Sequence, residues 1–300
     1  MSADPDRTGE LEHFIAVDFF GAHGRVFDWC MVRVLQVSDS HLSAGAPYAD
    51  RNWQAVLDHV DATRPDLVVH TGDISCNGAG DINDLRHAYS QLDRLSVPWR
   101  AIPGNHDIGD FGDGPQRVSD ARRRRYAAIF GDLSWSFHLG GIKFVGIDVQ
   151  TLLSDLPAGA ELWEWLGGEL DTSEPVALFV HRPLLPWHPA ELDDPNRYVT
   201  EPGRGRLADL LHNVDLRLVA SGHVHQWRAV EHGQTGHVWA PSTWATLPEH
   251  IQPTIGTKVV GCVDHELDPA AERGATSTLV QPPGVVQVTI GEDFASPYEH

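Results

Sequence analysis

The stretch MVRVLQVSDSH, residues 31–41, joins a buried-strand pattern to side chains that can hold a metal ion. Apolar residues dominate positions 32–37, and Asp39 and His41 follow directly. Residues i and i+2 of an extended chain point to the same side, so we expect this carboxylate and this imidazole to share one ion. Residues 1–30 show no steady periodicity, and we expect them to be an N-terminal extension outside a core that starts near Met31.

Beyond this stretch, short apolar runs alternate with amphipathic stretches. We expect strands at 32–37, 67–69, 99–102, 142–147, 176–180 and 216–220, and helices at 53–60, 85–95, 121–130, 162–170 and 205–214. This alternation is typical of an α/β fold and predicts one domain over residues 31–300. The long polar segments 109–120 and 182–205 are expected to be functional loops, the second of them lid-like. We expect loose surface at 264–283 and a closing strand at 284–290.

The composition is that of an acidic globular protein. Of the 300 residues 41% are hydrophobic, and 22 Lys and Arg stand against 42 Asp and Glu, a formal net charge of −20. Long nucleic acids are bound through many cationic side chains, so we expect no such partner. No apolar run approaches the roughly 18 residues of a membrane span. The start also lacks a signal-peptide pattern, so we expect a cytoplasmic protein without a membrane partner.

The run Arg122–Arg125 has two interpretations, a nucleic-acid patch or the solvated face of a helix. The surrounding sequence SDARRRRYAAIFG has an Asp near its start and a Gly at its end. Both features are typical of a capped surface helix, which we therefore favour.

Almost every apolar run ends on residues that can bind a metal. The second run is followed by Gly72 and Asp73, a carboxylate whose two oxygens can bridge two ions. The third leads into GNHD, residues 104–107, the fifth into His181 and the sixth into GHVH, residues 222–225. Ligands of open α/β sheets gather at the carboxyl ends of the strands, where these residues fall.

The GNHD segment also has a plain interpretation as a tight turn, because Pro-Gly and Asn-containing dipeptides form turns. Asn105 offers an amide oxygen, a hard ligand that suits a divalent ion when aspartates already balance its charge. Asp107 is expected to brace the turn. His223 and His225 lie at i and i+2, so we expect them to face one side together.

Taken in order, the segments VSDSH, TGD, PGNHD, VHRP and SGHVH resemble the calcineurin-like metallophosphoesterase superfamily, most closely its class III cyclic-nucleotide phosphodiesterase branch. The resemblance implies two stacked mixed β-sheets flanked by helices, a four-layer α/β/β/α sandwich with a dinuclear site. It implies that Asp39, His41 and His225 hold one metal, that Asn105, His181 and His223 hold the other, and that Asp73 bridges both. By the same resemblance, His106 is no ligand but lies over the site, where it protonates or stabilises the departing oxygen.

Such a centre hydrolyses phosphoesters, because two divalent ions lower the pKa of a shared water and clamp the oxygens of an in-line displacement. Mn, Fe, Zn and Co all suit Asp, Asn and His ligands. We expect a small phosphodiester substrate, with a 3′,5′-cyclic nucleotide as one candidate. A phosphomonoesterase or broad phosphatase is the alternative, and a non-catalytic binding scaffold is an alternative of another class. The sequence is compatible with a homodimer.

Three residues are candidate substrate contacts: Asn105, His106 and Arg182. Arg182 stands where the branch commonly has a second histidine, and it is either a fork for a phosphate or a solvated loop residue.

Overall fold

The structure is a computed structural model that describes residues 31–293 except 46, 113, 185–195 and 272–274. The predicted extension, residues 1–30, and residues 185–195 of the predicted lid lie outside the described residues. The helices are α1 (Pro47–Thr63), α2 (Ile82–Leu92), α3 (Asn105–Ile108), α4 (Asp120–Phe130), α5 (Val149–Leu152), α6 (Pro157–Leu170) and α7 (Gly203–Leu211). The strands are β1 (Val32–Val37), β2 (Leu67–His70), β3 (Trp99–Ala101), β4 (Trp135–Leu139), β5 (Ile142–Ile147), β6 (Val176–Val180), β7 (Leu216–Ser221), β8 (Gln226–His232), β9 (Thr235–Trp239), β10 (Thr257–Lys258), β11 (Cys262–Leu267) and β12 (Thr276–Val280).

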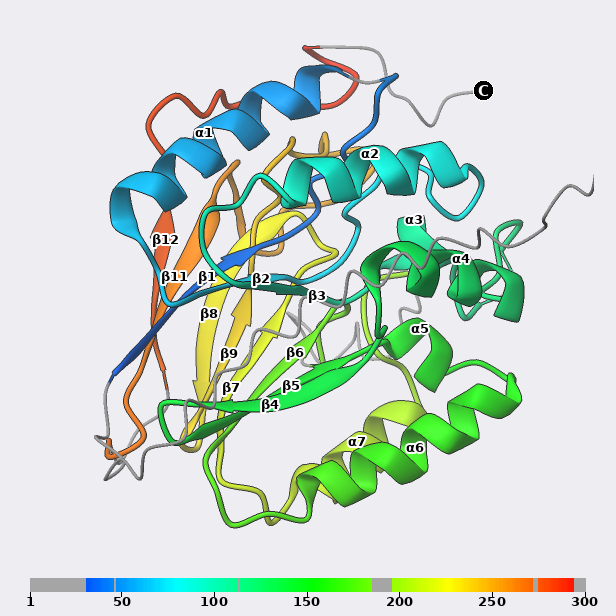
Figure 1. Cartoon of the computed structure of the whole chain (residues 1–300), viewed down its shortest axis with the longest axis vertical. Coiled ribbons are helices and arrows are strands. Elements are labelled where there is room, and N and C mark those ends of the chain that lie inside the picture. Colours follow the sequence, from blue (N-terminus) through cyan, green and yellow to red (C-terminus); the bar gives the residue numbers. More distant parts are fainter. Residues whose placement is uncertain (1–30, 46, 113, 185–195, 272–274, 294–300) are drawn as a thin grey trace, which may run out of the picture.

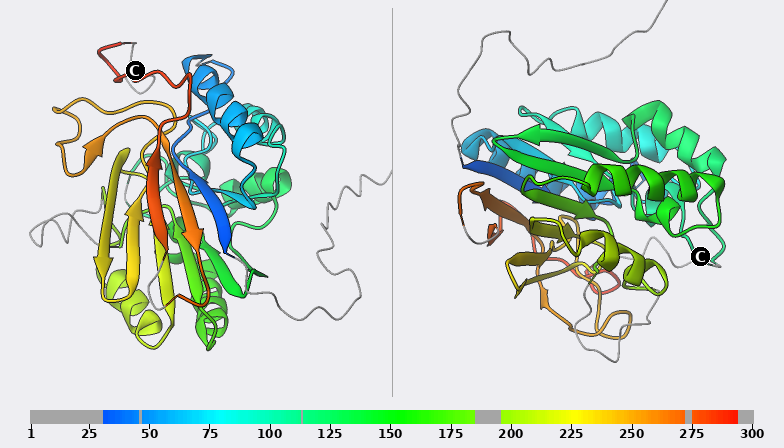
Figure 2. Two further views of the ribbon diagram at one scale, coloured as in Figure 1. Left: turned by 90° about the vertical axis from the view of Figure 1, so that its left-hand side faces the viewer. Right: turned by 90° about the horizontal axis from the view of Figure 1, so that it is seen from below.

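Two mixed sheets form the centre of the molecule. The first has the strand order β12-β11-β1-β2-β3, and the second has the order β10-β8-β9-β7-β6-β5-β4. Strands β1, β2 and β3 are parallel to one another, as are β5, β6, β7 and β9. Helices α1 and α2 cover the first sheet, and α6 and α7 cover the second, so the predicted four-layer sandwich is confirmed (Figures 1 and 2).

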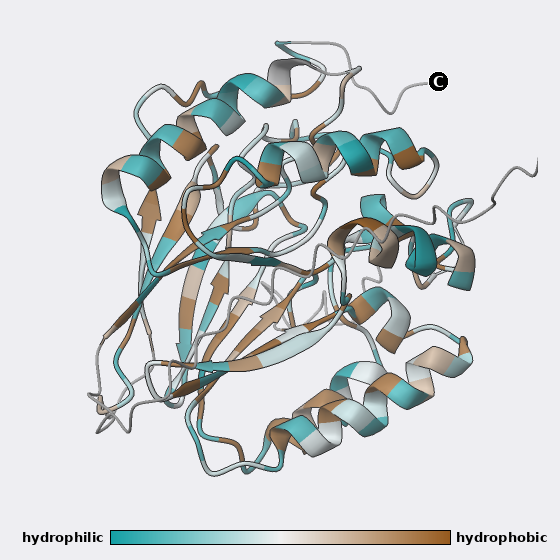
Figure 3. Ribbon diagram, viewed as in Figure 1, coloured by the Kyte–Doolittle hydropathy of each residue, from teal (hydrophilic) through white to brown (hydrophobic). Residues whose placement is uncertain are grey.

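Strand β1 shows why the layers form. Its residues alternate between two environments, because successive side chains of a strand point to opposite faces. Val34 packs in the core between the sheets, whereas Leu35 and Val37 pack in the core beneath the helices of the first sheet. Figure 3 shows hydrophobic residues along the strands of both sheets. Each sheet is therefore buried on both faces.

A polar cross-link also joins the two sheets. Gln36 is fully buried, and its Nε2 donates to the carbonyl oxygen of Ser221 in the second sheet at 3.0 Å. Its Oε1 lies 3.0 Å from Nε2 of His265, whose pKa burial lowers to about 3. This imidazole is neutral at physiological pH, so it donates to Gln36 without placing a charge in the core.

The helix that carries Arg122–Arg125 is a capped surface helix, as predicted. The side chain of Ser119 accepts from Arg122 N at the start of α4, and Gly131 ends the helix with φ 82°. Arg122 Nε and Arg125 Nη2 both donate to the carbonyl oxygen of Ala79. These two arginines therefore hold a neighbouring loop.

Two predictions for the C-terminal part are wrong. Residues 264–283 contain most of β11 and all of β12 rather than loose surface, and β11 pairs antiparallel with β1, with Val32 opposite Leu267. Residues 284–290 form no strand, only isolated bridge residues at Thr289 and Ile290. Their backbone groups bond to side chains and loops instead, for example Val286 N to Asn52 Oδ1. Among the described residues, no helix is both long and apolar enough to cross a membrane.

Candidate metal centre

Five strand ends converge on one edge shared by the two sheets. Asp39 and His41 follow β1, Asp73 follows β2, Asn105 opens α3 after β3, His181 follows β6, and His223 and His225 follow β7. The first two exits are joined by backbone hydrogen bonds, from Asp39 N to Gly72 O and from His41 N to Asp73 O, both at 3.0 Å. The parallel pairing of β1 and β2 therefore continues into the loops that carry these side chains.

The chain is not extended at these exits, so the predicted i, i+2 geometry is wrong. Asp39 and His41 have φ values of 51° and 44°, and His223 and His225 have φ values of 69° and 51°. These are left-handed conformations, which cost about 1–2 kcal/mol for a residue with a Cβ atom. The side chains of Asp39 and His41, and those of His223 and His225, face the converging strand ends because the backbone turns at each of these residues.

The first cluster comprises Asp39, His41 and His225, all of them buried. His41 Nε2 lies 3.2 Å from His225 Nε2, which in turn lies 3.4 Å from Asp39 Oδ1. Among the described residues no donor forms a hydrogen bond to the buried Asp39 Oδ1. Two imidazole nitrogens and a carboxylate oxygen thus converge, which is a donor set for a divalent cation.

The second cluster comprises Asp73, Asn105, His181 and His223. Nε2 of His181 lies 3.2 Å from His223 Nδ1, 3.2 Å from Asn105 Oδ1 and 3.4 Å from Asp73 Oδ2. Asp73 Oδ2 also lies 4.0 Å from His41 Nε2 in the first cluster. The Asp73 carboxylate therefore faces both clusters.

Backbone carbonyls orient three of the histidines. His181 Nδ1 lies 2.8 Å from Thr71 O, His223 Nε2 lies 2.7 Å from Asn196 O, and His225 Nδ1 lies 3.0 Å from Ala245 O. A carbonyl oxygen only accepts, so each of these nitrogens carries a hydrogen and the other ring nitrogen turns a lone pair inward. Lone pairs that face one another across about 3 Å repel unless a proton or a cation lies between them. The residues present therefore fit two divalent ions.

The electrostatics of the centre also favour positive charge. Burial raises the pKa of Asp73, but the imidazoles of His181 and His106 outweigh it and lower that pKa well below its usual range. Burial lowers the pKa of His181, but Asp73 outweighs it and raises that pKa to about 9. A cation that binds at His181 must displace this proton, so metal binding should weaken as the pH falls.

Two residues of the GNHD turn, Asp107 and His106, lie next to the segment that carries Asp73. Asp107 braces the turn, because its carboxylate accepts from the backbone nitrogens of Ile74, Ser75 and Gly104. Burial raises the pKa of Asp107 to about 6. His106 is 27% exposed, its Nδ1 lies 2.8 Å from Cys76 O, and its Nε2 lies 3.9 Å from Asp73 Oδ2. The Cys76 carbonyl thus directs Nε2 of His106 toward the centre.

Sequence reasoning missed several residues that support the centre. His70 is buried and spans two ligand loops, because its Nε2 lies 2.8 Å from Ser40 Oγ and its Nδ1 accepts from Gly72 N at 3.2 Å. Trp244 is buried with its ring centroid 4.9 Å from that of His41. The sequence does contain a signal for His70, because it is a histidine at the end of the apolar strand β2. The carbonyl groups that orient ligands carry no signal in the sequence, because every residue has one.

The predicted lid is described in part. Tyr198 is fully buried and packs against Trp239 at a centroid distance of 6.0 Å, so this ring fills the protein interior. Arg182 is also buried, and its guanidinium contacts Asp110. It is therefore not a solvated loop residue.

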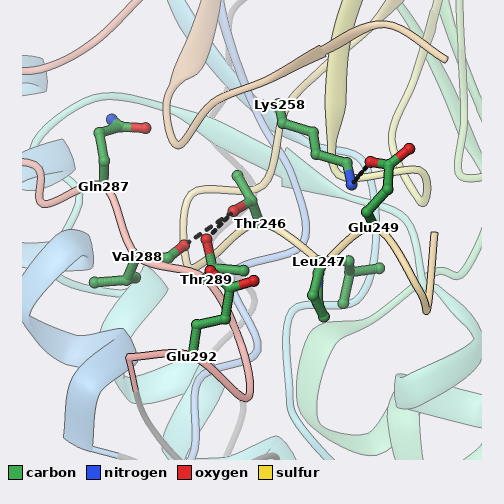
Figure 4. A pocket seen from close by; sticks show the side chains of 9 residues that line it. Thr246, Leu247, Glu249, Lys258, Gln287, Val288, Thr289 and Glu292 are labelled. Atoms are coloured by element: carbon green, nitrogen blue, oxygen red, sulfur yellow. Dashed lines mark hydrogen bonds and ion pairs between the residues drawn. The ribbon is translucent and has the colours of Figure 1, made fainter. Parts of the chain in front are cut away.

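A separate pocket of about 380 Å³ lies beside the loop that follows Ala245 (Figure 4). Its lining residues are Thr246, Leu247, Pro248, Glu249, Lys258, Gln287, Val288, Thr289 and Glu292. Lys258 and Glu249 form an ion pair of 2.8 Å, and the hydroxyls of Thr246 and Thr289 lie 2.9 Å apart. None of these lining residues belongs to the two clusters, so the metal centre and this pocket are distinct places.

Comparison with known proteins agrees with this geometry. Residues 32–227 match the family model described as calcineurin-like phosphoesterase. The chain is 30% identical over 216 residues to a protein of Arcobacter nitrofigilis named "Probable glycerophosphodiester phosphodiesterase GpdQ", covering 64% of this chain and 71% of that protein. It is 26% identical to a protein of Synechococcus named "Probable cyclic nucleotide phosphodiesterase", covering 72% of this chain and 82% of that one.

A solved dimetal phosphatase from Danio rerio shares the fold. The TM-score is 0.59 at 15% identity, and the match covers 83% of this chain and 99% of that structure. The family model spans well over half of the chain. The names of the relatives and the His/Asp clusters agree with the phosphoesterase family that it describes. The chain is a metallophosphoesterase and belongs to the calcineurin-like phosphoesterase family.

Proposed function

We propose that this protein hydrolyses a small phosphodiester at a dinuclear metal centre, with a 3′,5′-cyclic nucleotide as one candidate substrate. The observation that carries the proposal is the pair of converging donor clusters, with the Asp73 carboxylate in the second cluster and facing the first. In this proposal Asp39, His41 and His225 hold one divalent ion, Asn105, His181 and His223 hold the other, and Asp73 bridges them. Mn, Fe, Zn and Co are all suitable for these donors.

Two divalent ions bound there supply Lewis-acid stabilisation of phosphoryl oxygens and a water of lowered pKa. Only two of the seven proposed ligands, Asp39 and Asp73, are anionic, so the chain offsets half of the four positive charges that two divalent ions bring. With the carboxylates of Asp39 and Asp73 counted, the occupied centre carries about +2, although the chain as a whole carries −20. The global field repels long polyanions, and the local field attracts one phosphate, which favours a small substrate.

His106 supplies the remaining proton chemistry in this proposal. Cys76 O accepts the Nδ1 hydrogen of His106, so Nε2 faces the centre, and the imidazolium form would carry there a second proton that can pass to the departing oxygen. The 27% exposure of His106 also leaves it accessible to a bound substrate. Asn105, whose Oδ1 lies 3.2 Å from His181 Nε2, precedes His106 at the start of α3.

The preference for diesters is supported by two relatives whose names include phosphodiesterase. We expect protein reconstituted with Mn²⁺ to hydrolyse bis(p-nitrophenyl) phosphate faster than p-nitrophenyl phosphate, as measured by kcat/KM. Metal-stripped protein is the control and should be inactive on both. Cyclic nucleotides and glycerophosphodiesters would then be compared directly. A preference for the monoester would identify a phosphatase, and inactivity of the two-metal form on all four substrate types would support the scaffold alternative.

Replacement of Gly104 by alanine should disturb the bridging carboxylate without removing it. A Cβ atom at Gly104 would lie 2.1 Å from Asp73 Oδ1 and 2.3 Å from Asp73 N, so Asp73 has to move. A displacement of about 1 Å at a reacting centre costs roughly 10²-fold in rate, and we expect a loss of that size in kcat/KM.

The matched control for this change is Gly168→Ala in α6. A Cβ atom there meets no described atom within 4 Å, so activity should be unchanged. Full activity of the Gly104→Ala protein would show that the position of Asp73 does not limit the reaction.

A further inference from the structure

We propose that Arg182 and Asp110 form a positioning pair that sets the geometry of the second cluster. Arg182 follows His181 at the end of β6, and Asp110 follows the short helix α3, which opens with Asn105. The pair thus joins the two segments that carry these proposed ligands. This inference rests on the proposed dinuclear function.

The Arg182 side chain is buried and fixed by contacts with Asp110 and Phe111. The side chain is 1% exposed, its Nη2 lies 2.5 Å from Asp110 Oδ2, and its guanidinium carbon lies 4.8 Å from the ring centroid of Phe111. A buried guanidinium requires a partner to offset its desolvation, and a carboxylate with an aromatic face supplies one. An arginine fixed in this way presents almost no surface to a phosphate.

The side chain of Asp110 is 33% exposed, but the backbone around it is anchored. Gly109 turns the chain directly after α3 with φ 94°, and a Cβ atom there would lie 2.6 Å from Gln116 O. Asp110 N then donates to Gln116 O at 2.8 Å, and Phe111 N donates to the buried Gln150 Oε1 at 3.3 Å. Asp110 is therefore a fixed point at the base of a closed loop.

The pair bridges the two sheets at the site. Asn105 comes from the end of β3 in the first sheet and His181 from the end of β6 in the second, yet Asn105 Oδ1 and His181 Nε2 lie only 3.2 Å apart. Arg182 is covalently next to one of them, and Asp110 is one helical turn and a glycine beyond the other. Loss of the pair should loosen this cluster and leave the cluster of Asp39, His41 and His225 intact.

The test is a Co²⁺ titration of the metal-stripped full chain by calorimetry. The variants are Arg182→Met, Asp110→Asn, the double variant and Arg182→Lys, which keeps the charge but not the planar fork. The control is Arg124→Met, an exposed arginine of α4. Changes around metal ligands weaken binding by about 10- to 100-fold, so we expect one of the two binding steps to weaken by that factor and the other to stay unchanged.

Non-additivity is the second expected signature. If the two side chains act as one unit, the double variant binds Co²⁺ no more weakly than the worse single variant. We also expect kcat to fall with little change in KM in each variant, and Arg182→Lys to recover part of the loss. Circular dichroism shows whether each variant folds, and the isosteric Asp110→Asn change carries the test if Arg182→Met unfolds the chain.

Two results would overturn the positioning pair. One is unchanged affinity for both ions in Arg182→Met and Asp110→Asn. The other is a large rise in KM for Arg182→Met alone with both metal affinities intact, which would make Arg182 a direct substrate contact. Failure of the unsubstituted chain to bind two ions would instead refute the dinuclear centre itself.

Discussion

Replacement of Asp73 by alanine is expected to remove both metal ions and to lower phosphodiester hydrolysis by at least about 10³-fold, since Lewis-acid stabilisation is worth several kcal/mol. The reason lies in the position of one carboxylate between two clusters, 3.4 Å from His181 Nε2 and 4.0 Å from His41 Nε2. Without it, each cluster loses an anionic ligand, and facing imidazoles remain with less charge to hold a cation.

Metal content by atomic emission, measured after dialysis, checks this result beside the rate. Asp58→Ala, at an exposed acidic residue of α1, is the matched control and should keep both ions. The Asp73→Asn variant separates charge from shape, because it keeps the side-chain volume. Retention of two ions by the Asp73→Ala protein would refute the bridging role.

His106→Ala is expected to keep both ions and lose about 10²- to 10⁴-fold in kcat, the range of general acid catalysis. The loss should be largest for alkyl leaving groups, which need a proton, and smallest for p-nitrophenolate, which departs without one. The His106 Nε2 direction set by Cys76 O is the structural basis for this expectation.

The measurement is a series of diesters that differ only in leaving-group pKa. His138→Ala serves as control, because His138 is 52% exposed on the edge strand β4. An equal loss across the series would argue that His106 stabilises the centre electrostatically and donates no proton.

The sequence predicted every parallel strand of the two sheets except β9. Strands 142–147 and 176–180 have the predicted bounds, because continuous apolar runs are typical of strands buried on both faces. Strands β4, β8, β9, β10, β11 and β12 were not predicted. Several of their residues are polar or half-exposed, and β11 finds its partner β1 more than 200 positions away. Such pairing depends on tertiary context and leaves little periodicity in the chain.

The site was predicted at the level of side chains. The structure brings together all seven proposed ligands, and the histidine and carboxylate members gather in the clusters around Asp73. What could not be predicted is how they are held. Left-handed backbone at Asp39 and His41, carbonyl partners such as Thr71 O, and the Arg182 contact with Asp110 all arise from tertiary folding.

The proposed metal ligands are divided between the two sheets, so metal binding at the centre should stabilise the folded chain. Asp39, His41, Asp73 and Asn105 come from one sheet, and His181, His223 and His225 come from the other. A ligand that binds only the native arrangement adds about 2.7 kcal/mol of stability at one hundred times its Kd. Because the proposed ligands come from both sheets, bound metal would stabilise the interface between the sheets. A cell short of metal would hold a chain that opens and is degraded more readily, so the abundance of this protein should follow the metal supply.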